Sequence, residues 1–203
     1  SRDKSYRQEQ AGYAPSILDT GKNYNVKIHW FNFDPVKWSV VDEENGKAFL
    51  VCKTRLETIT FGKNTWAQSP IREYLNDKIY NVIFNDAQKA IVLQSTVAND
   101  IKSMGGYGVG HEDFTTYATD DYLFLLSYAE FELYKSKFIG SISTSSYCVA
   151  TLSKGYIWMR SHYKFQLDSN SRITAFDGSG EIPGKNPEYS ELGHILPAMR
   201  ISL

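Results

Sequence analysis

A single tight turn, Asn45-Gly46, constrains this chain more than any other local feature. Two β-rich runs flank it, Val36–Val41 and Lys47–Cys52, and the polar segment Asp42–Gly46 joins them. Asn followed by Gly readily adopts the positive φ angles that a tight hairpin connection requires. The sequence therefore predicts an antiparallel β-hairpin in this region.

Three short helices are predicted from residues that cap helix N-termini. Ser69 can accept hydrogen bonds from the first amides of a helix, while Pro70 fills a position that needs no amide. Two further pairs have the spacing of a reciprocal capping box, Asn85 with Gln88 and Ser127 with Glu130. We expect the apolar residues after each pair to continue a helix: Ala90, Ile91 and Val92 after the first, and Phe131, Tyr134 and Phe138 after the second.

The C-terminal third is predicted to be a set of short antiparallel strands joined by polar, glycine-containing loops. The predicted strands are Tyr156–Arg160, Arg172–Phe176 and Ile195–Ile201, preceded by a buried strand at Tyr122–Leu126. Helices in the middle and strands at both ends indicate one α+β domain, whose first and last strands could meet. Residues 1–20 lack periodicity and are interpreted as an N-terminal arm, which leaves residues 21–203 as the domain.

The composition limits the classes of partner. The 203 residues include 22 Lys+Arg and 23 Asp+Glu, a net charge of −1, so no positive field is available to hold a nucleic acid. Apolar runs fall far short of the ~20 residues that span a bilayer. We therefore expect neither a nucleic-acid partner nor a transmembrane segment.

The two cysteines, Cys52 and Cys148, are in no metal-ligand or redox spacing. Cys52 lies in an apolar run and is interpreted as a buried thiol. A disulfide between the two is the alternative in an oxidising compartment. The four histidines are scattered, and the chain lacks the Gly-x-Ser-x-Gly turn that presents a nucleophilic serine. The residues therefore give no support for a hydrolase.

Several motifs follow one another in a specific order along residues 21–203. The most informative are Ile157-Trp-Met-Arg-Ser161 and Leu196-Pro-Ala-Met199, which come after the hairpin, Ser69–Asn76 and Tyr122–Ser127. Together they resemble a bacterial domain family of unknown function with a WWLRS strand and a closing RPAL strand. Leu196 stands where the closing motif has arginine.

This resemblance implies a single C-type-lectin-like domain, with short antiparallel strands and two or three short helices. The resemblance thereby implies a fold shared with formylglycine-generating enzymes and with the variable receptor proteins of diversity-generating retroelements. Neither cysteine matches the catalytic cysteines of those enzymes, so we expect a non-enzymatic protein without a cofactor. The resemblance also implies that Arg160 makes a buried, hydrogen-bonded pair.

The loops between the C-terminal strands hold the candidate binding residues. Residues 161–170 mix aromatic and polar side chains as adaptable binding surfaces do. The predicted contacts are His162, Tyr163, Phe165, Gln166, Asp168 and Asn170 in this loop, and Asp177, Glu181, Asn186 and Tyr189 in the next. The acidic turns around Asp168 and Asp177 could hold Ca²⁺, although turn-forming Asp and Asn explain the same pattern.

Three hypotheses follow for function. The first is a non-enzymatic recognition module that presents residues 161–171 and 177–194 to a protein or glycan ligand, at the cell surface or outside the cell rather than in the cytoplasm. The second is an enzyme related to the formylglycine-generating group. The third is a structural subunit of a surface or phage assembly, in which the N-terminal arm docks on a neighbour.

Overall fold

The hairpin predicted around Asn45-Gly46 forms one edge of the main sheet. The computed structural model describes residues 36–62, 65–98, 118–144, 155–163, 172–177, 179–181 and 191–203, all within the unit Val36–Leu203. In it, β1 (Trp38–Glu44) pairs antiparallel with β2 (Lys47–Cys52). Asn45 and Gly46 have φ angles of 52° and 69°, as the tight turn requires. The hairpin prediction is confirmed, whereas the predicted boundary near residue 21 lies outside the described residues.

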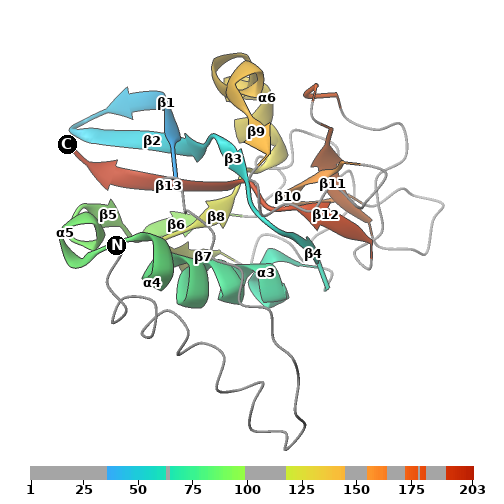
Figure 1. Ribbon diagram of the computed structural model, residues 1–203, viewed down its shortest axis with the longest axis horizontal. Helices are drawn as coiled ribbons and strands as arrows, with labels where there is room; N and C mark the ends of the chain where they lie inside the picture. Colours follow the sequence, from blue (N-terminus) through green and yellow to red (C-terminus); the bar gives the residue numbers. More distant parts are fainter. Residues whose placement is uncertain are drawn as a thin grey trace, which may run out of the picture. The chain divides into compact units, whose positions relative to one another are not determined.

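The last strand of the domain lies beside the second strand of the hairpin. The last strand, β13 (Pro197–Ser202), pairs antiparallel with β2 on one edge. On its other edge β13 pairs with β5 (Val92–Leu93) and β8 (Phe124–Leu125), which completes the five-stranded sheet in Figure 1. The expectation that the first and last strands meet is wrong, because β2 lies between β1 and β13; the last strand pairs with the second strand instead.

A second sheet has four strands in the order β11-β10-β12-β4. Its members are β4 (Thr58–Thr60), β10 (Ile157–Tyr163), β11 (Arg172–Phe176) and β12 (Leu192–His194). β10 is antiparallel to β11 and parallel to β12. Two strand pairs complete the β structure, β3 (Thr54–Arg55) with β9 (Ser143–Thr144) and β6 (Ser95–Val97) with β7 (Thr119–Asp121).

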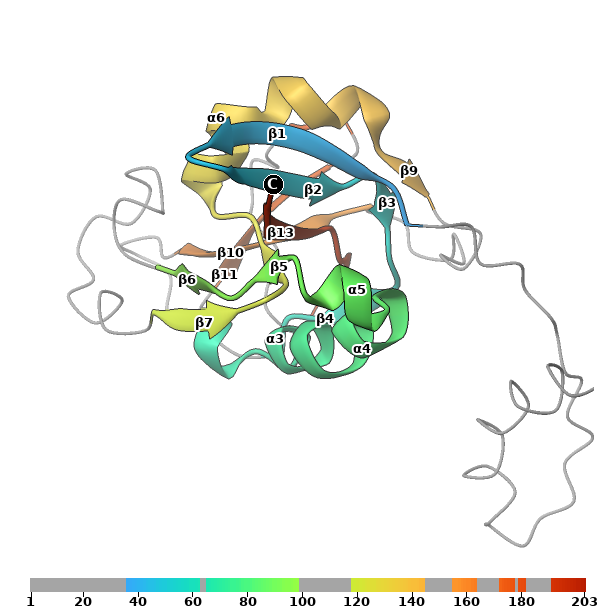
Figure 2. The ribbon, with the colours of Figure 1, turned by 90° about the vertical axis from the view of Figure 1, so that its left-hand side faces the viewer.

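The longest helical segment begins where Ser69 and Pro70 predict it. After the 3₁₀ turn η1 (Trp66–Gln68), the elements α3 (Pro70–Glu73), η2 (Tyr74–Ile79) and α4 (Tyr80–Ile83) continue one another in helical geometry. The Ser69 side chain accepts from the Ile71 amide, which confirms the predicted cap. The middle segment, η2, is a π-helix. Figures 1 and 2 show this helix on one side of the strands and α6 on the other.

Both predicted capping boxes are present, but the helices that they start differ in length. Ser127 and Glu130 cap α6 (Tyr128–Phe138), which is followed by the 3₁₀ turn η4 (Ile139–Ser141). Asn85 and Gln88 cap only the single turn α5 (Asp86–Lys89). The expectation that Ala90–Val92 continue that helix is wrong, because Val92 enters β5 and pairs with Ile201.

Two strands have bounds in the structure that differ from those predicted from the sequence. The run Tyr122–Leu126 contributes only Phe124 and Leu125 to β8, because Asn76 takes the backbone amides of Tyr122 and Leu123 with its side chain. The last strand begins at Pro197 instead of Ile195. Short range patterns of apolar residues do not reveal which amides a distant side chain will occupy.

Arg160 makes the buried pair that the resemblance implies. Its Nη1 atom donates to Glu130 Oε2 at 2.5 Å and to the Leu125 carbonyl oxygen at 2.6 Å. Burial by itself would raise the pKa of Glu130. The charge and hydrogen bond of Arg160, the Ser127 amide and the charge of Arg200 together hold that pKa below its usual value. This pair ties α6 to β10 inside the core.

Trp158 and Cys52 both lie in the core, and for Cys52 this confirms the expectation from the sequence. Trp158 is fully buried and donates from Nε1 to the Ile59 carbonyl oxygen at 2.8 Å. Cys52 is a buried free thiol, and burial raises its pKa to about 12. Within the described ranges, no helix is long and apolar enough to cross a membrane. The mixture of strands and short helices makes the described part a small α+β domain.

Candidate functional site

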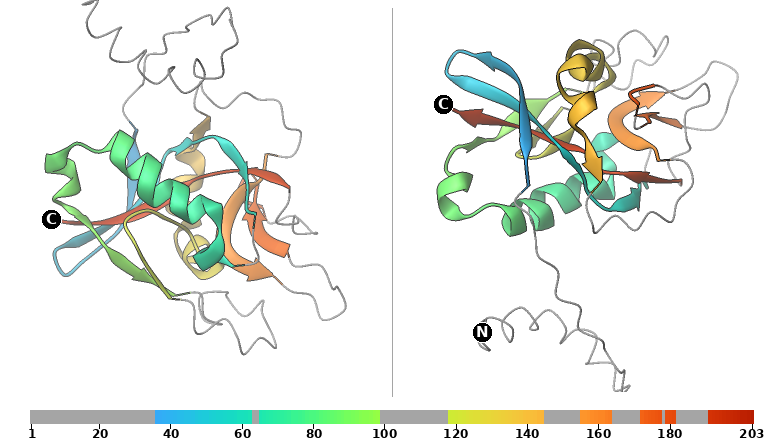
Figure 3. Two further views of the ribbon diagram at one scale, coloured as in Figure 1. Left: turned by 90° about the horizontal axis from the view of Figure 1, so that it is seen from below. Right: turned by 45° about the horizontal axis from the view of Figure 1, so that its top comes forward.

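The first predicted binding loop begins later than expected. β10 runs to Tyr163, so Ser161, His162 and Tyr163 belong to a strand instead of a loop. The register of β10 with β11 shifts between Trp158 and His162. Figure 3 shows β10 as a curved orange ribbon. The remaining predicted contacts of this loop, Phe165, Gln166, Asp168 and Asn170, lie outside the described residues.

Asp177 in the second predicted loop closes a turn. Its Oδ1 atom accepts from the Ser179 amide at 2.8 Å, the Ser179 hydroxyl at 2.6 Å and the Glu181 amide at 3.0 Å. The Ser179 hydroxyl, with the amides of the turn, lowers the pKa of Asp177 despite an opposing effect of burial. Asp177 is therefore the turn-forming residue that the sequence favoured, and Asn186 and Tyr189 lie outside the described residues.

The described ends of the two loops lie at opposite ends of the second sheet. Tyr163 pairs with Arg172 at one end, and Ile157 pairs with Phe176 at the other. The first loop therefore joins the strands at one end, and the segment after Phe176 starts about 13 Å away, the length of β11 at 3.3 Å per residue. The two predicted sets of contacts do not start from a common edge.

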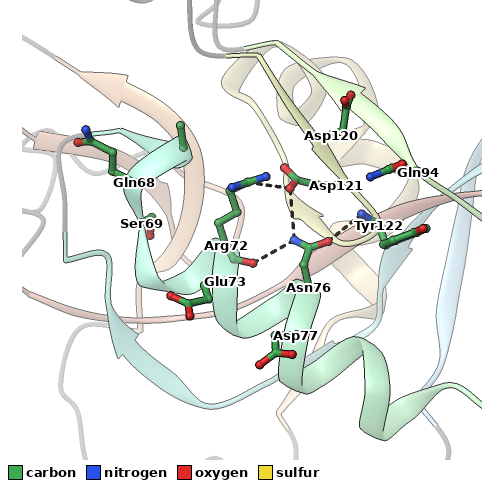
Figure 4. Close-up of a pocket in the computed structure, with 11 residues that line it drawn as sticks. Gln68, Ser69, Arg72, Glu73, Asn76, Asp77, Gln94, Asp120, Asp121 and Tyr122 are labelled. Carbon is green, nitrogen blue, oxygen red and sulfur yellow. Dashed lines mark hydrogen bonds and ion pairs between the residues drawn. The ribbon is translucent and has the colours of Figure 1, made fainter.

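A pocket of about 510 Å³ lies elsewhere, between the α3–η2 helix and β7 (Figure 4). The strand side contributes Gln94, Asp120, Asp121 and Tyr122. The helix side contributes Ala67 and six polar residues, which are Gln68, Ser69, Arg72, Glu73, Asn76 and Asp77. We call it the Arg72–Asp121 pocket. Among the residues that the structure describes, its lining contains neither histidine nor cysteine.

Asp121 forms the floor of the Arg72–Asp121 pocket. It is 1% exposed, and its carboxylate accepts hydrogen bonds from three elements. Trp66 Nε1 donates at 2.8 Å and Thr119 Oγ1 at 2.6 Å to Oδ2, while Arg72 Nε donates at 2.7 Å to Oδ1. Because these donors engage both oxygens, Asp121 anchors η1, α3 and β7 to one another.

Asn76 fixes the strand against the helix. Its Oδ1 atom accepts from the Tyr122 amide at 2.7 Å and the Leu123 amide at 3.1 Å. Its Nδ2 atom donates to the Leu123 carbonyl oxygen at 2.9 Å and to the Arg72 carbonyl oxygen at 3.0 Å. Asn76 lies in the π-helical segment, and such segments occur often at functional sites.

The rim of the Arg72–Asp121 pocket carries polar groups that are not engaged. Gln68, Glu73, Asp77 and Gln94 are exposed, and within the described residues their side chains make no hydrogen bond. The two Nη groups of Arg72 are likewise without a hydrogen bond there, since only Nε meets Asp121. The pocket thus offers amide, carboxylate and guanidinium groups to a ligand above a floor that is already satisfied.

A dedicated metal centre does not occur in the described part of the chain. No group of three or more His, Cys, Asp or Glu side chains there is arranged to hold a metal ion. Asp120 accepts from Thr96 Oγ1 at 2.6 Å, and Asp121 is engaged by its donors. What this arrangement supports chemically is hydrogen bonding to a polar ligand.

Sequence reasoning did not identify the Arg72–Asp121 pocket. The sequence contained one indication of this pocket. Arg72 and Asn76 stand four residues apart on a predicted helix and so share a face. Their partner Asp121 lies 45 or more residues further along the chain, and no local pattern connects them. Folding alone brings these groups together.

The comparisons with known proteins agree with the resemblance in one respect, that the chain contains a domain of unknown function. A family described as a domain of unknown function (DUF6273) matches residues 45–201, most of the chain. The match includes the second strand of the hairpin, the Arg72–Asp121 pocket and the closing strand. No curated protein and no solved structure matches significantly. The chain belongs to the DUF6273 family of domains of unknown function.

Proposed function

We propose that this domain is a non-enzymatic recognition module of C-type-lectin-like type, located outside the cell or at its surface, and that its ligand binds in the Arg72–Asp121 pocket. One observation carries the proposal. The pocket combines a buried, fully hydrogen-bonded floor with exposed polar groups that have no partner among the described residues.

The floor supports recognition because it holds the pocket in one geometry. Asp121 and Asn76 join η1, α3, η2 and β7 through hydrogen bonds between side chains and backbone. A preformed site loses less conformational entropy on binding than one that must be ordered. The rim groups can therefore contact a ligand without a rearrangement of the helix or the strand.

The C-terminal loops extend the proposal to larger ligands. Residues 161–171 and 177–194 remain candidate contacts for a protein or glycan, as the resemblance implies. Their described ends at Tyr163 and Phe176 lie at opposite ends of β11.

The test is a screen of the full chain against an array of glycans and an array of peptides. The double variant Gln68→Ala/Gln94→Ala removes two exposed amide groups that make no hydrogen bond within the described residues, so it should fold normally. Glu132→Gln on α6, on the other side of the strands, is the matched control. We expect a ligand of the wild type that the control retains and the double variant loses. An absence of ligands on both arrays, or ligands that the double variant binds equally well, would overturn the proposal.

A further inference from the structure

His194 is a buried histidine on an interior strand of the second sheet. It is the last residue of β12, it is 8% exposed, and its amide donates to the Tyr156 carbonyl oxygen at 2.7 Å. On one side it pairs with Ile157 of β10, and on the other with Thr58 of β4 (Figure 1). His194 therefore lies where β4 is joined to the rest of the sheet.

Short pairings hold β12 and β4 in place. Within the described residues, β12 meets β10 through the single pair Ile157–His194 and meets β4 through three pairs. β4 ends the described sheet, and the Trp158 indole holds it further by donating to the Ile59 carbonyl oxygen. Segments with few bonds at the edge of a sheet open at a lower free energy than the core of a domain. We therefore expect β12 and β4 to open more easily than β2 and β13.

A fixed cation, Arg55 of β3, lies beside His194. The next residue, Leu56, donates its amide to the Ile195 carbonyl oxygen at 2.9 Å, so the Arg55 segment runs along the end of β12. The Nε atom of Arg55 is buried and has no hydrogen bond within the described residues. Burial and the charge of Arg55 lower the pKa of His194, and a hydrogen bond with the Leu56 backbone opposes them. A proton on His194 would therefore place a second positive charge in a buried position beside the first.

Three other titratable groups lie on the segments around His194. Burial raises the pKa of Glu57, between β3 and β4, against the charge of Lys78. A carboxyl group whose pKa is raised by folding adds stability as the pH falls, so a loss of stability in acid does not come from Glu57. Tyr156 is uncharged below about pH 8. Glu191 precedes β12, and two residues separate it from His194.

We propose that His194 is an acid-sensitive switch in this part of the fold. Neutral His194 holds β12 between β10 and β4, and its protonation releases β12 and β4 while the five-stranded sheet stays folded. The folded-state pKa of His194 lies below the ordinary value of about 6.5, so the open state binds a proton more readily. The stability that neutral His194 contributes is therefore complete above about pH 6.5 and is lost as the pH falls toward the folded-state pKa. The switch is separate from the Arg72–Asp121 pocket, so it can fail without affecting the proposed function.

The experiment measures amide hydrogen exchange of the full chain by NMR at pH 7.5, 6.5 and 5.5, corrected for the intrinsic exchange rate at each pH. Protection of the His194 and Ile195 amides and of the Trp158 indole N–H should be constant between pH 7.5 and 6.5. From pH 6.5 to 5.5 it should fall several-fold, with an upper limit of about tenfold for the uptake of one proton. The amides of β2 and β13 should keep their protection. Constant protection of β12, or an equal loss in β2 and β13, would overturn the proposal.

Four variants assign the response to His194. His194→Gln carries no charge at either pH and should abolish the response, and Arg55→Met should reduce it, because the neighbouring charge is gone. His162→Gln in β10 and Glu191→Gln before β12 are the matched controls and should retain it. A response that survives His194→Gln, or that either control abolishes, would overturn the proposal.

A direct titration covers the case in which His194→Gln does not fold. The ring resonances of His194 in the wild type should titrate with a midpoint below pH 6.5, and Arg55→Met should move that midpoint upward. A midpoint at or above pH 6.5 in the wild type would show that protonation does not release β12, and the proposal would fall.

Discussion

Arg72 meets the buried carboxylate of Asp121 through Nε, at 2.7 Å from Oδ1, and not through its terminal amino groups. The Arg72 side chain is 32% exposed, whereas that of Asp121 is fully buried. One guanidinium group therefore has two roles. It compensates a buried charge through Nε, and both of its Nη groups have no hydrogen bond to the described residues and so can bind a ligand.

Removal of the Asp121 charge should destabilise the domain. Asp121→Asn keeps the size of the side chain but weakens the bonds from Trp66, Thr119 and Arg72. We expect a loss of about 1.5–3 kcal/mol in the free energy of unfolding, the range for hydrogen bonds to charged groups. Urea denaturation followed by tryptophan fluorescence measures it.

Asp120 is the matched control for this measurement. It is the neighbouring residue in β7, it is exposed, and within the described residues its side chain accepts one hydrogen bond, from Thr96 Oγ1. Asp120→Asn should change the free energy of unfolding by about 0.5 kcal/mol or less, as is usual at the surface. Equal losses for the two variants would show that Asp121 is not the anchor of the site.

Glu130 should make stability depend on pH in the acid range. Its pKa in the folded protein lies below the usual value, because Arg160, Ser127 and Arg200 together outweigh the effect of burial. The unfolded chain then binds more protons than the folded one between the two pKa values. The contribution of Glu130 is therefore complete above about pH 5 and is lost as the pH falls through the folded-state pKa.

The measurement is the free energy of unfolding at a series of pH values for wild type and Glu130→Gln. Glutamine preserves the capping-box geometry but leaves Arg160 without its anionic partner, so a loss of about 3–5 kcal/mol is expected at neutral pH. The difference between the two proteins should shrink in acid. Glu132→Gln, which removes only an exposed pair with Lys135, should leave the pH profile unchanged. A constant difference at all pH values would contradict this account.

Tyr134 should ionise later than an ordinary tyrosine. Burial, the hydrogen bond from its hydroxyl to Asp42 Oδ2 at 2.8 Å and the nearby carboxylates raise its pKa to about 12. Because the folded-state pKa is raised, this group adds stability below its usual value of about 10, and that stability is lost as the pH rises toward 12. In an ultraviolet titration, the wild type should show an ionisation step near pH 12 that Tyr134→Phe lacks. If the variant instead lacks a step near pH 10, the Tyr134 hydroxyl is not bonded to Asp42 in solution.

Gly193 should not accept a side chain. A Cβ atom at this position would lie 2.6 Å from Trp158 Cε2 and 2.7 Å from Nε1, and the buried indole is held by its bond to Ile59. Gly193→Ala should cost about 1–3 kcal/mol of stability as an overpacking change. Gly140→Ala is the control, because a Cβ atom there would have no neighbour within 4 Å. Equal stability of the two variants in thermal unfolding would show that β12 can move away from Trp158.

Local chemistry in the sequence determined the starts of several elements. Asn45-Gly46 specified the hairpin, and Ser69, Asn85 and Ser127 specified helix N-termini, because turns and caps depend on residues only a few positions apart. The resemblance also placed most of the chain in a domain family of unknown function, and the match to residues 45–201 bears out that coarser statement. The sequence by itself went no further than an α+β domain of a family without a known function.

Tertiary structure decided where the candidate site lies. Asp121 meets Trp66, Arg72 and Asn76 across 45 to 55 residues, and Tyr122 meets Tyr80 across a similar span. It also decided that β10 would continue through His162 and Tyr163, since a register shift against β11 is a property of the pair of strands. Such contacts depend on the closure of long loops and on which side chain accepts a hydrogen bond from which backbone amide. A local sequence pattern encodes neither of these.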